Sequence, residues 1–309
     1  MTKFYIKKRK KIFRNFLEKV IVSNFLLKRS FYFLKYFFYS KQTRFNCKFN
    51  KKDYNLVIGA VYGMSPNSVE IFLSSLRKFY KNDIVLIGVK TDVKKFSQLC
   101  KKYKCDFIED NNNPLNGFIN RYKIYVKILN KFKFKNNILL SDTRDVYFQN
   151  NPFKNMSSNK IYIGSEKNIF FQDHINSTWV EKFYNFNTLF KLKNKQVLCS
   201  GVILGKAKIL KKFFILLINE HAKVLKKFKY KSLSFPRGSD NTTVNYCYYF
   251  LCKKENFIIT KALSNKISTM AALNTNEIKI RNNKFVTSTN KLISIVHQYD
   301  RYFKIFKKK

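Results

Sequence analysis

The chain has 309 residues, of which 62 are Lys or Arg and 18 are Asp or Glu, so its formal net charge at pH 7 is +44. Hydrophobic residues make up 45% of the chain, which is enough for a sizeable core. The charge favours anionic partners such as nucleic acid, acidic membranes, nucleotides or polyanionic glycans. A genome rich in A and T is another source of the lysines, but it does not explain the shortage of acids.

Six cysteines stand at positions 47, 100, 105, 199, 247 and 252. None forms a CxxC pair or a Cys/His cluster with zinc spacing, which excludes the common zinc modules. No secretory signal peptide is evident. We therefore expect a reducing, cytoplasmic setting, in which Cys199, within an apolar run, is a buried free thiol.

Residues 1–50 interleave bases with aromatic and aliphatic residues and differ from the rest of the chain. No apolar run among them reaches the roughly 18 residues needed to span a bilayer. Such a segment is suited to lie peripherally on the inner face of an anionic membrane. An ordinary helix packed against the following domain is the alternative. We expect 1–50 to be an N-terminal appendage and 51–309 to be one domain.

From residue 55 onward, strand and helix patterns alternate. Ser65 has the side chain of a helix N-cap, and Pro66 suits the first helical position. The alternation predicts an α/β fold with a mostly parallel sheet and helices on both faces. From runs and spacing of apolar residues we expect strands at 56–62, 84–89, 105–108 and 138–141, and helices after Ser65, at 93–103 and around 118–129.

The second half of the chain is less regular. We expect a long helix at 206–226, a helix that opens at Asp240, and an irregular helical region at 176–191. Strands are expected at 160–166, at 199–205 and at 293–297, the last of which ends in His297. No internal repeat and no Pro/Gly-rich linker divides this region, so a single domain is the simplest interpretation.

Two aspartates, Asp142 and Asp145, follow the apolar strand expected at 138–141. In open α/β sheets, ligands bind at the carboxyl ends of the strands. Two carboxylates at such an edge are suited to hold a divalent cation, which in turn would hold a diphosphate. An N-capping Asp beside a surface Asp in a tight turn is the alternative.

Several short motifs resemble those of GT-A-fold glycosyltransferases that use nucleotide-diphospho-sugars. The resemblance covers about residues 55–300, and only the block at 139–149 is reasonably specific. It implies a GT-A-like, Rossmann-type fold in which 51–309 is the catalytic domain. It also implies metal-dependent transfer of a sugar from a nucleotide-sugar donor to a glycan, lipid or protein acceptor. The motifs are Ala-Val-Tyr-Gly at 60–63, Arg121, Leu-Leu-Ser-Asp-Thr-Arg-Asp-Val-Tyr-Phe-Gln at 139–149, Cys-Ser-Gly-Val-Ile-Leu-Gly at 199–205, Ser-Asp-Asn at 239–241 and His297.

In this family an Asp-x-Asp motif binds Mn²⁺ or Mg²⁺, which bridges the phosphates of the donor. Here the two aspartates are three residues apart. Asp145 matches the last, metal-binding carboxylate, and Asp142 then contacts the metal directly or through water, or binds the ribose or the donor sugar. His297 matches a C-terminal His that completes the metal site in several of these families, although a strand-end His is more often a structural hydrogen-bonding group. An imidazole with carboxylates suits Mn²⁺ better than Ca²⁺.

The resemblance places five further residues at the donor. Ala60 and Tyr62 would cradle the nucleotide base, although both also suit core packing. Arg121 would fork onto a phosphate or pair with a strand-end aspartate, with a plain surface Arg as the alternative. Ser200 and Gly201 match a segment beside the sugars, where a glycine required for close strand packing is the alternative.

Asp240 resembles an acid at the catalytic centre of the family. If the reaction inverts, a carboxylate must accept the proton of the acceptor hydroxyl, and Asp240 is the first candidate, followed by Glu166 and Asp173. If the reaction retains, Asp240 is expected to bind hydroxyls of the donor sugar. N-capping of the helix that follows is the alternative.

A basic protein that binds nucleic acid or a membrane surface without catalysis is the rival class of function. No zinc finger, RNP-like motif or helix-turn-helix is visible, and the bases are spread over the whole chain. We therefore expect no specific nucleic-acid partner. Neither rival requires the set Asp142, Asp145 and His297.

Overall fold

A computed structural model defines the fold of most of the chain. All of its described residues belong to one compact unit, Phe45–Lys309. The predictions for residues 1–50 lie outside the described residues. The described ranges are 55–110, 117–132, 136–157, 159–227 and 239–302.

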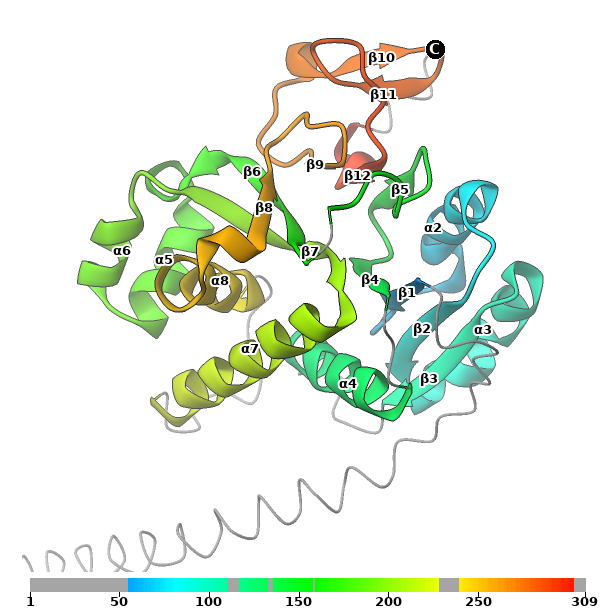
Figure 1. Cartoon of the computed structure of the whole chain (residues 1–309), viewed down its shortest axis with the longest axis horizontal. Helices are drawn as coiled ribbons and strands as arrows, with labels where there is room; N and C mark the ends of the chain where they lie inside the picture. The colour runs from blue at the N-terminus through cyan, green and yellow to red at the C-terminus, as the bar shows by residue number, and fades with distance from the viewer. Residues whose placement is uncertain (1–54, 111–116, 133–135, 158, 228–238, 303–309) are drawn as a thin grey trace, which may run out of the picture. The chain divides into compact units, whose positions relative to one another are not determined.

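The unit is built on a seven-stranded sheet with the order β3-β2-β1-β4-β7-β6-β8 (Figure 1). The pairs β1/β2, β2/β3, β1/β4 and β6/β8 are parallel, and β7 is antiparallel to both of its neighbours. The predicted α/β fold with a mostly parallel sheet is therefore confirmed. The strands are β1 (Leu56–Ala60), β2 (Ile84–Val89), β3 (Asp106–Asp110), β4 (Asn137–Asp142), β6 (Ile161–Ile169), β7 (Gln196–Lys206) and β8 (Phe257–Thr260).

Helices pack on both faces of the sheet because successive strand residues point to opposite sides. Leu56 and Ile58 of β1 join one buried apolar cluster, which helices α4, α7 and α8 share. Val57 joins another, which includes α2 and α3. These helices are α2 (Pro66–Phe79), α3 (Lys90–Tyr103), α4 (Gly117–Phe132), α7 (Ala207–Lys227) and α8 (Ser239–Tyr246).

A second, three-stranded sheet with the order β5-β12-β9 lies beside the carboxyl end of β4 (Figure 1). It consists of β5 (Val146–Phe148), β12 (Ile295–His297) and β9 (Ile267–Thr269). β5 is antiparallel to β12, and β12 is parallel to β9. A separate hairpin is formed by β10 (Lys279–Arg281) and β11 (Lys284–Val286).

The structure departs from the predicted elements in a few places. β3 continues past the expected end at 108 to Asp110, and α3 begins at Lys90, before the expected start at 93. The irregular region consists of the two short helices α5 (His174–Phe183) and α6 (Phe186–Leu192). Strands β8 to β11 were not predicted. Each has only three or four residues, which is too short to show an alternation of apolar and polar residues.

Two local predictions are confirmed. α2 begins at Pro66, and the Ser65 hydroxyl oxygen accepts a hydrogen bond from the Ser68 amide at 3.3 Å, as expected of an N-cap. Cys199 is a buried free thiol, as expected. The other described cysteines are also free thiols. None of the helices within the described ranges is both long and apolar enough to cross a bilayer.

Candidate metal centre

The site lies where the order of the main sheet reverses. From β1 the chain passes to β2 on one side, and β4 lies on the other side of β1. Ala60, the last residue of β1, is the register partner of Asp142, the last residue of β4. Such a switch point, at the carboxyl ends of neighbouring parallel strands, is where open α/β sheets bind ligands.

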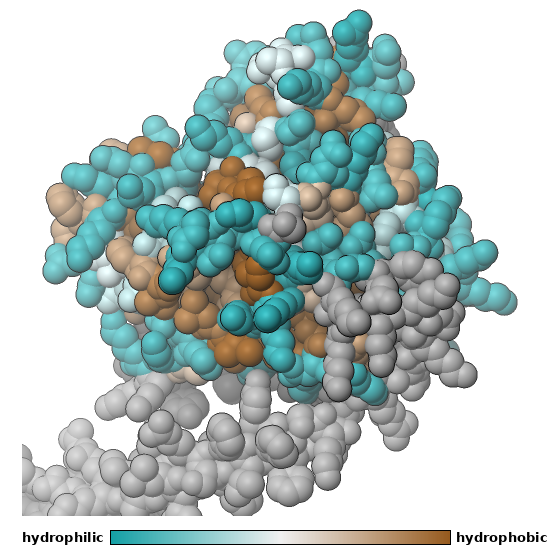
Figure 2. All heavy atoms as spheres, viewed as in Figure 1, coloured by the Kyte–Doolittle hydropathy of each residue, from teal (hydrophilic) through white to brown (hydrophobic). Residues whose placement is uncertain are grey.

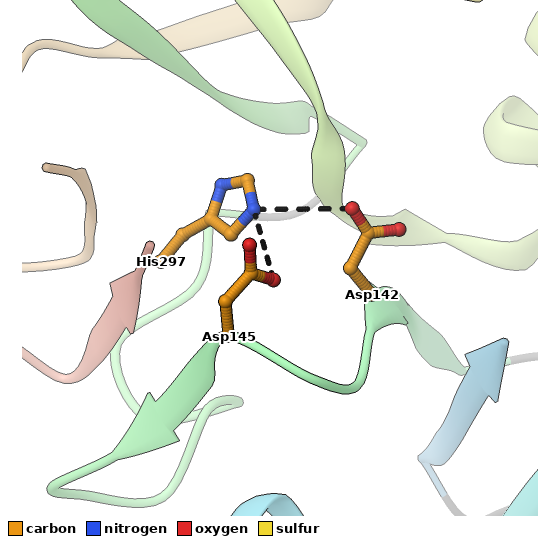
Figure 3. Close-up of side chains that lie close together, drawn as sticks. All are labelled: Asp142, Asp145 and His297. Atoms are coloured by element: carbon orange, nitrogen blue, oxygen red, sulfur yellow. Dashed lines mark ion pairs between the residues drawn. The ribbon is translucent and has the colours of Figure 1, made fainter. Parts of the chain in front are cut away.

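Three side chains converge at this switch point: Asp142, Asp145 and His297 (Figure 3). Nε2 of His297 lies 3.9 Å from Oδ2 of Asp142 and 3.7 Å from Oδ1 of Asp145. One ligand atom from each residue lies within 4.8 Å of the others. Among the residues that the structure describes, no other group of three or more His, Cys, Asp and Glu side chains is arranged to hold a metal.

The register of the small sheet brings His297 to the aspartates. β5 begins directly after Asp145, and its first residue, Val146, is paired with His297 at the end of β12. The backbone amide of Gln298 then donates to the carbonyl oxygen of Asp145 at 2.6 Å. Two residues that are remote in the sequence are thus fixed beside each other by main-chain pairing, which side-chain changes disturb little.

Each aspartate directs one oxygen to an arginine and the other to His297. Oδ1 of Asp142 accepts a hydrogen bond from Arg121, while Oδ2 faces the imidazole. Oδ2 of Asp145 lies 3.6 Å from Arg144, while Oδ1 faces the imidazole. The Arg144 side chain is half exposed, so this second ion pair is weak.

Two of the three distances among these atoms suit a shared divalent cation, and all three atoms lie within 4.8 Å of one another. Two ligands that each lie about 2.1 Å from one ion can be up to about 4.2 Å apart, and both distances from His297 Nε2 fall below that limit. On the other side of the ring, Nδ1 lies 3.5 Å from Sγ of the buried Cys199. A partner on the second nitrogen fixes the orientation of a ligating imidazole.

Gly201 makes room for the imidazole. A Cβ atom at this position would lie 2.2 Å from Cε1 and 2.5 Å from Nε2 of His297, and 2.9 Å from Oδ2 of Asp142. No larger residue fits without moving two of the three candidate ligands. The family resemblance implied that Gly201 lies beside the sugars; the structure places it against His297 and Asp142 of the candidate metal centre.

Arg121 links the candidate metal centre to Asp240. It projects from α4, is buried, and donates through Nη1 to Asp142 and through Nη2 to Asp240 at 2.6 Å. The hydroxyl of Ser200 on β7 donates to the same oxygen of Asp240 at 2.7 Å, and lies 3.3 Å from Nη2 of Arg121. The alternative of a surface Arg is therefore wrong, and the Asp240 carboxylate is engaged by side chains from two other elements.

Ala60 ends β1, as expected, but the strand stops short of the expected end at 62, and Tyr62 lies in the turn that follows. Ala60 is buried, and its carbonyl oxygen accepts a hydrogen bond from the Thr143 hydroxyl at 2.7 Å. The Tyr62 hydroxyl donates to Oδ2 of Asp110 at 2.7 Å, and burial is the main cause that raises the Tyr62 pKa. Asp110 was not predicted from the sequence as a site residue. It ends β3 as Asp142 ends β4, but the strand was expected to stop at 108.

The two reserve acids have different environments. Asp173 is the N-cap of α5, and its carboxylate accepts from the backbone and side-chain nitrogens of Asn176, both at 2.9 Å. Glu166 on β6 is buried, and burial, followed by the charge of Asp173, raises its pKa to about 7. Burial, and then the charge of Glu166, also raise the pKa of the Cys199 thiol, whose Sγ lies beside His297.

No protein-family model matches this chain, and no curated protein is significantly similar to it. The geometry of the site is thus the guide to its chemistry. Two carboxylates and an imidazole surround one point at a sheet switch point, and a buried guanidinium joins that point to a further carboxylate. Such an arrangement can hold a divalent cation together with an anionic group.

Changing Gly201→Ala should weaken Mn²⁺ binding at least about 10-fold, because the new methyl group displaces His297 and Asp142. Gly205→Ala, on the same strand, is the matched control: its Cβ would press on the Lys160 carbonyl oxygen at 2.9 Å but touch none of the three ligands. Electron paramagnetic resonance of free Mn²⁺ measures both affinities. Equal losses in the two variants would contradict this site.

Glu166→Gln should flatten the pH dependence of stability. The pKa of Glu166 rises from 4.5 to about 7 on folding, so the native state binds more protons between these values and the free energy of unfolding falls as pH rises through them. The fall amounts to about 3 kcal/mol at most. Urea unfolding at pH 5 and pH 8.5, in EDTA, measures it. Glu181→Gln, at an exposed acid, is the control; parallel profiles in wild type and Glu166→Gln would contradict the burial argument.

Proposed function

We propose that the protein is a metal-dependent glycosyltransferase with a GT-A-like fold. It would move a sugar from a nucleotide-diphosphate sugar to a hydroxyl group of a glycan, lipid or protein. The observation that carries the proposal is the convergence of Asp142, Asp145 and His297 at the switch point of the main sheet. A site for nucleotides and a site for a divalent cation are expected to coincide there in an enzyme of this kind.

Oδ2 of Asp142, Oδ1 of Asp145 and Nε2 of His297 are the atoms that would hold Mn²⁺ or Mg²⁺. A bound cation supplies positive charge for the diphosphate leaving group. The imidazole favours Mn²⁺ of the two, because Mg²⁺ prefers oxygen ligands. Of the roles open to Asp142, direct contact with the metal agrees best with the orientation of its Oδ2.

The ends of β1 and β3 would receive the nucleoside. The small side chain of Ala60, at the end of β1 and paired with the last residue of β4, would permit close approach of the base. The Asp110 carboxylate at the end of β3 accepts a hydrogen bond from the hydroxyl of Tyr62, which follows the end of β1. A strand-end acid that hydrogen-bonds ribose hydroxyls is the recurrent solution in doubly wound nucleotide-binding folds.

Asp240 and Glu166 would have different roles at the sugars. Oδ2 of Asp240 already accepts from Arg121 and from Ser200, so this carboxylate is better suited to orient the donor sugar than to take a proton. Glu166 has a pKa of about 7, which suits a base that must accept and release a proton near neutral pH. If the transfer inverts, Glu166 is the proton acceptor we propose, ahead of Asp240. Cytoplasmic localisation stays a prediction from the sequence.

Two variants test the proposal together. Asp145→Ala should abolish Mn²⁺-dependent binding of UDP or GDP and lower turnover of the matching nucleotide sugar by several orders of magnitude. Asp240→Asn should leave nucleotide binding nearly unchanged and lower turnover on the order of 100-fold, because its contacts matter mainly at the sugars. Calorimetry with each nucleotide, with and without Mn²⁺, and a nucleotide-release assay give both quantities.

Wild-type-like turnover in EDTA or in Asp145→Ala would overturn the metal-dependent mechanism. Unchanged turnover in Asp240→Asn with a lower melting temperature would reduce Asp240 to a structural role. Salt-dependent binding of RNA, with no turnover of any nucleotide sugar, would favour the non-catalytic alternative.

A further inference from the structure

The surface around α5 and α6 carries an exposed apolar patch, which we call the α5–α6 patch. It consists of Phe171, Ile175, Phe186 and Phe190, whose exposed fractions are 81%, 64%, 62% and 56%. These are the four most exposed large apolar side chains of the described residues. Apolar residues reach the surface over these helices between hydrophilic ones (Figure 2). An apolar cluster left open to water marks a surface that binds a partner.

Contacts through Lys193 connect Phe171, Phe186 and Phe190 of the patch. The backbone amide of Phe171 donates to the carbonyl oxygen of Lys193 at 3.0 Å. The ammonium group of Lys193 lies 3.9 Å from the centre of the Phe190 ring, whose centre is 6.5 Å from that of Phe186. Ile175 lies in the first turn of α5, four residues after Phe171 in the sequence. Helix α5 packs on α6.

Bases surround the patch. Lys182, Lys191 and Lys195 are exposed, and Lys193 is half exposed. The acids between residues 170 and 195 are Asp173 and Glu181, and the Asp173 carboxylate is engaged as the N-cap of α5. The patch therefore combines apolar side chains that can leave water with cations that attract a negative surface.

The single tryptophan of the chain lies beside the patch. Trp179 is one helical turn after Ile175 and is partly exposed, whereas Asn176, Val180 and Phe183 are the buried residues of α5. Its ring centre lies 5.0 Å from the ammonium group of Lys182. Tryptophan next to lysine, with an apolar body and a polar tip, is favoured at the level of lipid headgroups.

We propose that the α5–α6 patch inserts into the interface of an anionic lipid bilayer. A second copy of the chain is a poorer occupant, because the lysines around the patch would then face one another. The segment 1–50 is poorer for the same reason, since Glu18 is its only acid among many bases. The proposal does not depend on the transferase reaction, so either can fail without the other.

Fluorescence of Trp179 in the full-length chain tests this directly. Phosphatidylserine/phosphatidylcholine vesicles with brominated acyl chains should quench the emission and shift it to the blue, because the quencher lies within the bilayer. Raising the salt concentration should reduce the effect, and pure phosphatidylcholine vesicles should produce little of it. Binding through residues 1–50 alone cannot mimic this signal, because they contain no tryptophan.

The triple variant Phe171→Ser, Phe186→Ser, Phe190→Ser should weaken vesicle-dependent quenching at least about 10-fold in apparent affinity. The double variant Phe79→Ser, Ile215→Ser is the matched control, because it removes exposed apolar side chains from α2 and α7. It should be quenched like wild type. Circular dichroism of each variant confirms that the fold is retained.

Three outcomes would overturn the proposal. Vesicle co-sedimentation without quenching of Trp179 would place the contact elsewhere, for example in residues 1–50. Equal quenching of wild type and the triple variant would show that the patch does not insert. A dimer in solution that the triple variant loses, with no quenching by vesicles, would make the patch an interface between copies.

Discussion

The site depends on the ion pairs that the buried guanidinium of Arg121 makes with Asp142 and Asp240. A charge in the interior of a protein is tolerated only when oppositely charged or hydrogen-bonding groups surround it. The Nη1 and Nη2 atoms of Arg121 find such groups in Asp142 at the end of β4, Asp240 at the start of α8, and the hydroxyl of Ser200 on β7. One side chain thereby fixes the relative positions of three elements. It also leaves the second oxygen of Asp142 directed at His297.

The distribution of acids gives the site its electrostatic character. The chain has far more bases than acids, yet several of its buried or partly buried carboxylates gather near the carboxyl ends of the strands: Asp110, Asp142, Asp145, Glu166 and Asp240. The surrounding positive field attracts an anionic ligand from solution. A cation between the carboxylates would then allow that anion to approach them. This combination is what the proposed transfer from a nucleotide-diphosphate sugar requires.

Local patterns in the sequence predicted most of the main sheet. The apolar run before Asp142 and the Ser65-Pro66 helix start depend on residues that are close in the chain, so their signals are strong. The small sheet could not be predicted in this way. Its register, which pairs Val146 with His297, depends on long-range contacts between three-residue strands. His297 could therefore be named from family resemblance, but its position beside Asp145 could not be derived.

Two further features of the site escaped prediction for related reasons. The carboxyl end of β3 is polar, so the strand was expected to end before Asp110, and its bond with Tyr62 was missed. The contact of Arg121 with Asp240 joins α4 to α8, and no local pattern indicates it. The clash that any side chain at Gly201 would make with His297 likewise becomes visible only when β7 and β12 are placed together.

Anomalous diffraction at the manganese edge, from crystals soaked in MnCl₂ and UDP or GDP, tests the central claim most directly. The account predicts one strong peak between the three ligands, about 2.1 Å from Oδ2 of Asp142, Oδ1 of Asp145 and Nε2 of His297, with the diphosphate on its open side. A peak at another place would contradict it. So would the absence of any peak, with the two aspartates paired only to Arg121 and Arg144.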